Sequence, residues 1–206
     1  YLSRSIGAEG VGMYQVALSV FAFLLIASCS GTPITVSRLM TKYKSENRLR
    51  DVNKIITAGL ASTLFTVLPV CVVCLLFGKK FAFLFADERC MNIFLVVLPG
   101  IVFTSLYSVL RGVFWGNKDF LPYSVIELLE EICMIIVGIL LINRATTAYQ
   151  GAFRAGAAVL CSYIFSFSLA TVVFFVRKNK LASPKGQLKP LLSSATDRKS
   201  TRLNSS

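Results

Sequence analysis

Long stretches without charge dominate the hydrophobic and polar pattern of this chain. They cover residues 10–37, 55–78, 90–110 and 155–176. Each reaches the roughly 20 residues that a helix needs to cross the hydrocarbon core of a bilayer. The pattern predicts five membrane-spanning helices, over residues 12–40, 52–77, 91–110, 120–142 and 152–176.

The first predicted helix carries a helix-breaking triplet in its interior, formed by Gly31, Thr32 and Pro33. Proline removes one backbone hydrogen bond and clashes with the preceding turn, so Gly31 and Pro33 are candidates for a break in this helix. Membrane helices tolerate such breaks where neighbours or a hydrated cavity satisfy the freed backbone groups. A packing kink and a functional break are both open interpretations.

Composition supports an all-α, polytopic transmembrane helix bundle. Of 206 residues, 55% are hydrophobic and 16% are charged, with a mean hydropathy of +0.68. Soluble domains carry about 25% charged residues. These values exclude a water-soluble enzyme, a secreted disulfide scaffold and a disordered chain.

The chain divides into a bundle and a polar end. Residues 1–180 are expected to form the bundle, and residues 1–4 are interpreted as the end of a truncated helix whose body precedes them. Residues 181–196 are expected to form a cytoplasmic polar segment. Residues 197–206 are interpreted as sequencing-adapter read-through, because codons for this peptide resemble a common adapter sequence.

Basic residues alternate along the predicted loops. Thirteen flank one side of the predicted membrane and six flank the other. By the positive-inside rule, the end near Arg4 faces outward and the segment after Arg177 is cytoplasmic. This distribution explains the net charge of +12 without a nucleic-acid partner.

The six cysteines do not indicate a metal or redox site. Cys71 and Cys74 have the spacing of such sites, but they lie in an apolar run and the chain has no histidine. They are interpreted as small hydrophobic side chains of a membrane helix. We expect no cofactor and no metal, and the chain shows no nucleotide-binding or catalytic motif.

Three acidic residues inside the fourth predicted helix are the most informative candidates for a functional site. Glu127, Glu130 and Glu131 stand at i, i+3 and i+4, so they share one helix face. A charge at the bilayer centre costs about 2.5–3.5 kcal/mol, so these carboxylates should face a polar cavity, pair with cations or take up protons. Candidate partners are Arg4, Arg38 and Arg111.

Two interpretations of these acids stay open: the lining of a substrate path, or a structural ion pair with a boundary acid near water. Several aromatic residues near the predicted membrane boundaries, among them Tyr107, Trp115 and Tyr123, are interpreted mainly as interfacial anchors.

Two blocks of sequence resemble one family. Residues 2–20 and 30–39, and residues 110–116 followed by Pro122, Glu130 and Glu131, resemble the polysaccharide-biosynthesis flippase family that includes stage V sporulation protein B. It lies within the multidrug/oligosaccharidyl-lipid/polysaccharide exporter superfamily. The resemblance implies two helical lobes around a central cavity that opens to alternate sides. It implies that this chain is the N-terminal-lobe part, with the end of helix 1 and helices 2–6, and lacks the C-terminal lobe.

The resemblance carries over to few residues. It implies that Arg4 lies near the cavity where cations meet pyrophosphate, that Arg111 and Gly112 match a motif after helix 4, and that Glu130 matches an acid of helix 5. The family often has arginine four residues after this acid, where this chain has Met134. Glu130 therefore needs another partner.

We hypothesise a flippase that moves lipid-linked oligosaccharide or peptidoglycan precursors across the bacterial cytoplasmic membrane, for envelope or spore-cortex synthesis. Its expected partners are membrane lipid, the lipid-linked saccharide and a coupling proton or sodium ion. A cation-coupled multidrug exporter is the first alternative. A membrane-embedded glycosyltransferase or polymerase is a second, which the short predicted outer loops disfavour.

Overall fold

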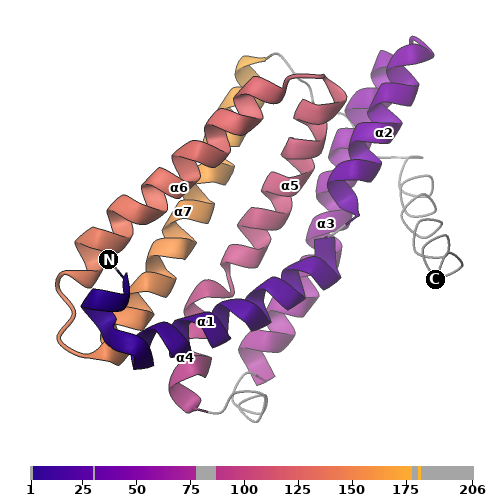
Figure 1. The fold of residues 1–206 in the computed structure, drawn as a ribbon. Helices are drawn as coiled ribbons and strands as arrows, with labels where there is room; N and C mark the ends of the chain where they lie inside the picture. The colour runs from indigo at the N-terminus through magenta and orange to yellow at the C-terminus, as the bar shows by residue number, and fades with distance from the viewer. Residues whose placement is uncertain (1, 30, 78–86, 178–180, 182–206) are drawn as a thin grey trace, which may run out of the picture.

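The computed structural model describes residues 2–29, 31–77, 87–177 and 181. Within these residues the chain forms helices only, as the hydropathy pattern predicts (Figure 1). They are α1 (Leu2–Cys29), α2 (Thr32–Ser45), α3 (Leu49–Phe77), α4 (Glu88–Val97), α5 (Gly100–Gly116), α6 (Phe120–Ile142) and α7 (Ala148–Val176). The predicted all-α bundle is confirmed.

Most of these helices have the length and hydropathy of membrane spans. Residues Ser3–Ser45, Leu49–Leu76 and Ala148–Val176 each qualify, and the bent pair α4 and α5 qualifies as one span. Helix α6 has 23 residues, which suffices to cross a bilayer core, but every long window in it contains three glutamates. The predicted span over residues 120–142 therefore has the same bounds as α6. It differs from the other spans because it carries three acidic residues in its interior.

The first predicted helix is interrupted between α1 and α2. Gly31 precedes the first turn of α2 and Pro33 lies within that turn, where a missing backbone N–H leaves no hydrogen bond unmade. The backbone N–H of Thr35 donates to the carbonyl of Gly31 over 3.1 Å, and the Thr35 hydroxyl donates to the same oxygen over 2.9 Å. The chain thus starts a new helix directly after the break.

The third predicted span, residues 91–110, is wrong as one continuous helix. The structure divides it into α4 and α5, which meet at a bend of 40°. Pro99 stands at this bend and has no N–H to donate to the preceding turn. The prediction also ended this span too early, because α5 continues to Gly116 and Arg111 is therefore helical.

Capping side chains explain why two helices begin earlier than predicted. The Asp87 carboxylate accepts from the backbone N–H of Arg89 over 2.8 Å and starts α4 at Glu88. Thr147 accepts from the N–H of Gln150 over 3.2 Å, and the Gln150 side chain accepts from the N–H of Thr146. This capping-box arrangement starts α7 at Ala148 instead of residue 152.

The N-terminal helix also begins earlier than residue 12. Helix α1 starts at Leu2 and contains one non-helical residue, Gly7, with φ of 71°. Only glycine adopts this conformation readily, so Gly7 turns the first residues of α1 away from the axis of the rest. Ile6 thereby packs against Gly151 in the first turn of α7.

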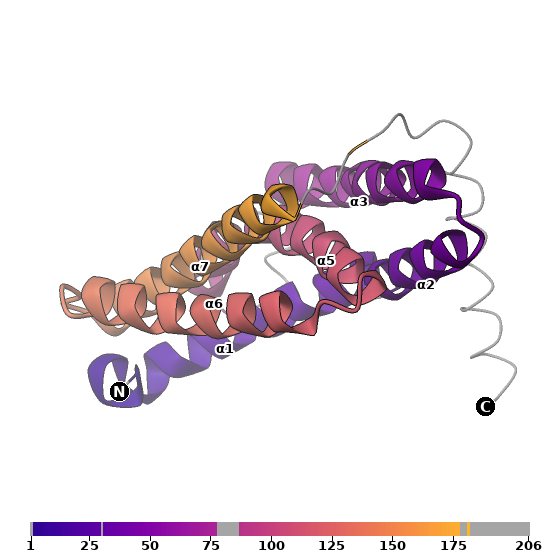
Figure 2. The same ribbon diagram turned by 90° about the horizontal axis from the view of Figure 1, so that it is seen from above.

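Helix α5 occupies the middle of the bundle. Viewed from above, α6 and α7 lie on one side of α5, α2 and α3 lie on the other, and α1 crosses below (Figure 2). Helix α6 packs mainly against α7 and touches α5 only sparsely. Helix α5 likewise has few contacts with α1, so α1, α5 and α6 pack loosely against one another.

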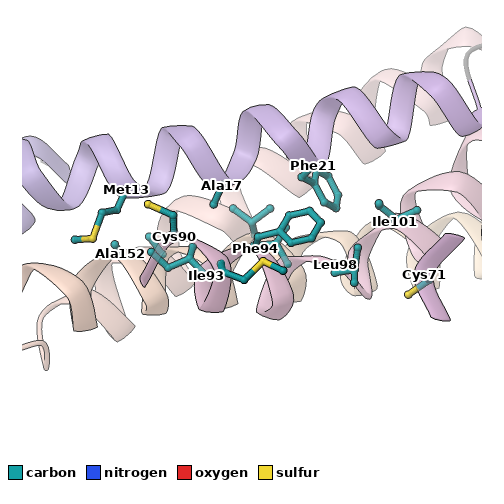
Figure 3. Close-up of a cluster of buried hydrophobic side chains, with 14 of the residues drawn as sticks. Met13, Ala17, Phe21, Cys71, Cys90, Ile93, Phe94, Leu98, Ile101 and Ala152 are labelled. Carbon is teal, nitrogen blue, oxygen red and sulfur yellow. The ribbon is translucent and has the colours of Figure 1, made fainter. Parts of the chain in front are cut away.

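Two hydrophobic cores stabilise opposite halves of the bundle. The first core joins α1 to α4 and the start of α7, and Figure 3 shows Ala17 and Phe21 of α1 facing Phe94 of α4. The second core joins α2, the first half of α3, α5 and the end of α7, with Val36 and Phe114 fully buried. Large apolar side chains that are at least 70% exposed, such as Phe23, Phe65 and Leu121, cover the outside. That exposure is typical of a surface in contact with lipid.

Charged residues gather at the two ends of the bundle. At one end, which we call the basic end, Lys44 donates to Asn117 and Arg177 pairs with Asp119 over 3.9 Å. At the opposite end Arg89 pairs with Glu9 over 3.5 Å. The basic end also contains Lys42, Arg48, Arg50 and Lys118.

Several predictions concern residues that the structure does not describe. The loop lysines Lys79 and Lys80, the basic residues between Lys178 and Lys189, the polar segment 181–196 apart from Leu181, and the tail 197–206 lie outside the described residues. The predictions that the polar segment is cytoplasmic and that the tail is an artefact stay predictions.

Candidate functional site

A polar cavity of about 610 Å³ lies between α1, α5 and α6. Its apolar wall comes mainly from α1, and its polar groups come from α5 and α6. The lining residues are Leu25, Ile26, Cys29, Thr104, Tyr107, Ser108, Arg111, Ser124, Glu127, Leu128, Glu130 and Glu131. A cavity of this size with convergent polar groups, set among membrane-spanning helices, is the candidate site of the molecule.

Close packing of α5 on α2 positions Arg111. The next residue, Gly112, faces the backbone of Pro33, and a Cβ atom there would lie 2.5 Å from the Pro33 carbonyl oxygen. Only glycine allows two helix backbones to approach this closely, as small residues do in membrane helix interfaces. The contact fixes α5 against the start of α2, with Arg111 on the side that faces α6.

Arg111 interacts with α6 and with two aromatic rings. Its Nη1 atom lies 3.4 Å from Oε1 of Glu127, and its guanidinium carbon lies 5.2 Å from the Trp115 ring centre and 5.9 Å from that of Tyr123. The two rings meet edge to face at 5.7 Å. Aromatic faces and a carboxylate thus compensate a guanidinium that lies within the bundle.

The three acids of α6 line the same cavity, as helical spacing requires. Glu127 pairs with Arg111, whereas Glu130 and Glu131 have no ion pair among the described residues. Glu130 is half-buried, and its carboxylate lies near the buried hydroxyl of Ser166 in α7. The same hydroxyl donates to the Tyr163 carbonyl over 3.2 Å.

Unpartnered polar atoms concentrate in this cavity. In the described part of the chain, five buried side-chain atoms lack a hydrogen-bond partner: Thr63 Oγ1, Thr104 Oγ1, Ser105 Oγ, Tyr107 OH and Arg111 Nε. Three of them belong to cavity residues of α5. Leaving such an atom unsatisfied costs about 1–3 kcal/mol, so each of these groups would gain from a water or a ligand.

Not all predicted site residues reach the cavity. Arg4 is exposed and precedes Gly7, near the start of α7 and away from Arg111, and Arg38 is exposed on α2. Neither lines the cavity. The charges that meet there are Arg111, Glu127 and the two following acids.

Tyr107 lines the cavity, which the sequence did not reveal. Its interpretation as an interfacial anchor is wrong, because it is only 5% exposed and lines the cavity from the interior of α5. Its spacing of four residues before Arg111 was the available signal, since that spacing places both on one helix face. Trp115 and Tyr123 lie near the basic end, but their rings contact Arg111.

An apolar hollow continues along α6 beyond the acids. It measures about 220 Å³ and is lined by Tyr14, Met134, Ile135, Gly138, Ile139, Ile142, Ala155 and Ala158. Met134 and Ile135 follow Glu131 by three and four residues, so the face of α6 that carries the acids becomes apolar toward the opposite end.

Cysteine and acid side chains show no metal site in the described part of the chain. All six cysteines are free, and Cys71 and Cys74 lie one turn apart on α3. Cys71 is buried in the first core and Cys74 packs against it.

Comparison with known proteins gives a consistent result. The sequence model of the family described as polysaccharide biosynthesis protein matches residues 1–203. The chain is 26% identical over 178 residues to stage V sporulation protein B of Bacillus subtilis (strain 168), which covers 85% of this chain and 34% of that protein. It is 23% identical over 192 residues to the lipid II flippase MurJ of the same strain, covering 86% of this chain and 35% of that protein.

The chain spans about a third of the length of these curated relatives, and no solved structure matches it. The family match nevertheless includes every described helix and the whole polar cavity. The chain belongs to the polysaccharide biosynthesis protein family of membrane proteins.

Proposed function

We propose that this chain forms part of a flippase that moves lipid-linked saccharides, such as peptidoglycan precursors, across the bacterial cytoplasmic membrane. The observation that carries the proposal is the polar cavity within the bundle, which Arg111 and Tyr107 line, and where the buried Arg111 Nε and Tyr107 hydroxyl lack a hydrogen-bond partner among the described residues. A named relative is a lipid II flippase, which supports the same class of substrate.

The two hollows along α6 suit an amphiphile. A polar headgroup fits the cavity with Arg111 and the acids, while the apolar hollow beside Gly138 offers a hydrocarbon surface next to it. Moving the headgroup between two water-exposed states requires the cavity to open to each side in turn. The match leaves about two thirds of each relative's length uncovered. A corresponding part of this protein would provide the facing wall of the cavity.

A coupling ion fits Glu130. The Ser166 hydroxyl donates to the Tyr163 carbonyl, so its lone pairs stay available to accept a hydrogen bond from a protonated Glu130. We propose that the basic end is cytoplasmic, as the positive-inside rule requires. A proton that enters through the membrane field then contributes about 2.3 kcal/mol per 100 mV, enough to bias two conformations.

Reconstituted transport tests the proposal. The intact protein is placed in liposomes with a fluorescent lipid-linked disaccharide, and the fraction that reaches the opposite leaflet is followed with an impermeant quencher. Arg111→Gln should slow transport at least about tenfold, since a charge-assisted contact contributes about 1.5–3 kcal/mol. Arg38→Gln is the matched control, because Arg38 is an exposed arginine outside the cavity. Equal rates for both variants, or no transport by the unchanged protein, would contradict the proposal.

One observation favours a second candidate, a cation-coupled exporter. Three carboxylates face one guanidinium in the cavity, and this excess of acid suits an organic cation. An exporter should move an organic cation such as ethidium, and Glu130→Gln should abolish that movement while the exposed Glu88→Gln does not. Transport of the lipid-linked disaccharide without transport of ethidium would exclude this candidate.

A further inference from the structure

The polar groups of the cavity form two opposed rows. Thr104, Tyr107 and Arg111 stand at i, i+3 and i+7 on α5, so they share one face of that helix. Glu127, Glu130 and Glu131 stand opposite them on α6. Tyr107 of α5 lines the same cavity as Glu127 and Glu130 of α6.

The two rows need different partners. Arg111 Nε can only donate a hydrogen bond, and the hydroxyls of Thr104 and Tyr107 can donate or accept. Ionised Glu130 and Glu131 can only accept. An organic cation would satisfy the acids and leave the α5 row without acceptors. A phosphate would satisfy the α5 row and be repelled by three carboxylates.

A neutral group that both donates and accepts satisfies both rows. Sugar hydroxyls do so, because each has one hydrogen and two lone pairs. We propose that the α5 and α6 walls of this cavity bind the sugar ring of the substrate rather than its pyrophosphate, with Thr104, Tyr107 and Arg111 on one side and Glu130 and Glu131 on the other. This inference rests on the proposed flippase function and assigns the part of the substrate that this site recognises.

Two substitutions remove single hydroxyls from the site without changing charge. Thr104→Val and Tyr107→Phe eliminate buried oxygen atoms that have no partner among the residues that the structure describes, so folding should persist. Thr63→Val is a matched control, because the Thr63 hydroxyl oxygen is also buried and unpartnered in the described part of the chain but lies on α3 outside the cavity. Tyr149→Phe is the control for tyrosine, since Tyr149 lies at the opposite end of the bundle.

Binding to two probes tests the assignment. The probes are a prenyl pyrophosphate and the same prenyl pyrophosphate bearing a disaccharide, titrated against the intact protein in nanodiscs. Thr104→Val and Tyr107→Phe should each weaken binding of the sugar-bearing lipid about fivefold, the effect of one neutral hydrogen bond, and leave the sugar-free lipid unchanged. The two control variants should bind both lipids as the unchanged protein does.

Other results overturn the inference in distinguishable ways. Equal weakening for both lipids would assign the row on α5 to the pyrophosphate and leave the flippase function intact. Unchanged binding in both cavity variants would remove the row from substrate recognition. Failure of the unchanged protein to bind either lipid would overturn the flippase function itself.

Discussion

At the scale of residues, Arg111 owes its position to its neighbours in sequence and in space. Gly112 lets α5 touch the backbone of α2, Trp115 follows one turn later, and Glu127 reaches across from α6. Arg111 had been one of three predicted partners for the acids, and the structure pairs it with Glu127. Sequence could not choose among the three arginines, because the choice depends on which helices pack side by side.

Gly112 allows a direct test of this packing. Gly112→Ala should destabilise the protein by about 1–3 kcal/mol, because the added methyl group would press on the Pro33 carbonyl, a backbone atom that cannot rotate away. The free energy of unfolding in mixed detergent micelles measures the effect.

Gly12→Ala is the control, since a Cβ at Gly12 meets no atom within 4 Å. That variant should be neutral or gain up to about 1 kcal/mol from helix propensity. If Gly112→Ala proved as stable as Gly12→Ala, the close contact between α2 and α5 would be wrong.

The cavity-lining residues that the sequence did not reveal are uncharged. Charges inside an apolar run attract attention because they are expensive in a membrane, and this reasoning found Arg111 and the three acids. Tyr107 and Thr104 are compatible with any membrane helix, so their importance follows only from burial without a partner. That property depends on tertiary packing, which hydropathy does not contain.

At the scale of elements, the sequence predicted the positions of the helices well. It predicted the break at Gly31 and Pro33 but not the bend at Pro99. Helix α6 has the predicted bounds, because the turns on both sides of it are polar. The bend at Pro99 was not predicted, because the uncharged run 90–110 continues through it. Hydropathy reflects how apolar a segment is. It does not detect the loss of one backbone hydrogen bond at a proline such as Pro99. The two early helix starts depend on caps, which lie in polar sequence outside the hydrophobic windows.

Helix α6 should insert poorly by itself. In a membrane-insertion assay with microsomes, the segment 120–142 should insert less efficiently than the segment 148–176, because each charge near the bilayer centre costs about 2.5–3.5 kcal/mol. Replacing Glu127, Glu130 and Glu131 by leucine should restore insertion. Leucine at Ile132, Ile135 and Ile136 is the control and should change little.

The hairpin of α6 and α7 should insert better than α6 alone, since α6 packs mainly on α7 and Ser166 lies beside Glu130. Efficient insertion of the isolated segment 120–142 would show that its acids are tolerated without tertiary shelter. The polar cavity would then not be needed to explain their presence.

At the scale of the whole molecule, the ends of the bundle differ in charge. Lys44, Arg48 and Lys118 lie at the basic end, whereas Glu88 and Arg144 lie at the opposite end. Each membrane span runs from one end of the bundle to the other. Successive loops therefore lie at opposite ends, and every second loop faces the same compartment. This arrangement agrees with the alternation of basic and less basic loops in the sequence.

Cysteine labelling of the intact protein checks the proposed orientation. In a variant without native cysteines, an impermeant maleimide added outside spheroplasts should label cysteine placed at Glu88 or Arg144. Cysteine at Arg48 or Lys118 should react only after permeabilisation. Labelling of both groups from the same side would contradict the bundle topology, and a reversed pattern would contradict the orientation alone.

The interruption at Gly31 separates the two cores along the chain. The last first-core residue of α1 is Cys29 and the first second-core residue of α2 is Val36, whereas the first core continues past Pro99 to Ile101 of α5. A change of helix angle at Gly31 would move α2 and would press on α5, because the two backbones touch at Pro33 and Gly112. Helix α6 packs mainly on α7 and only sparsely on α5, so a shift of α5 would change the distance between Arg111 and Glu127 and, with it, the width of the cavity.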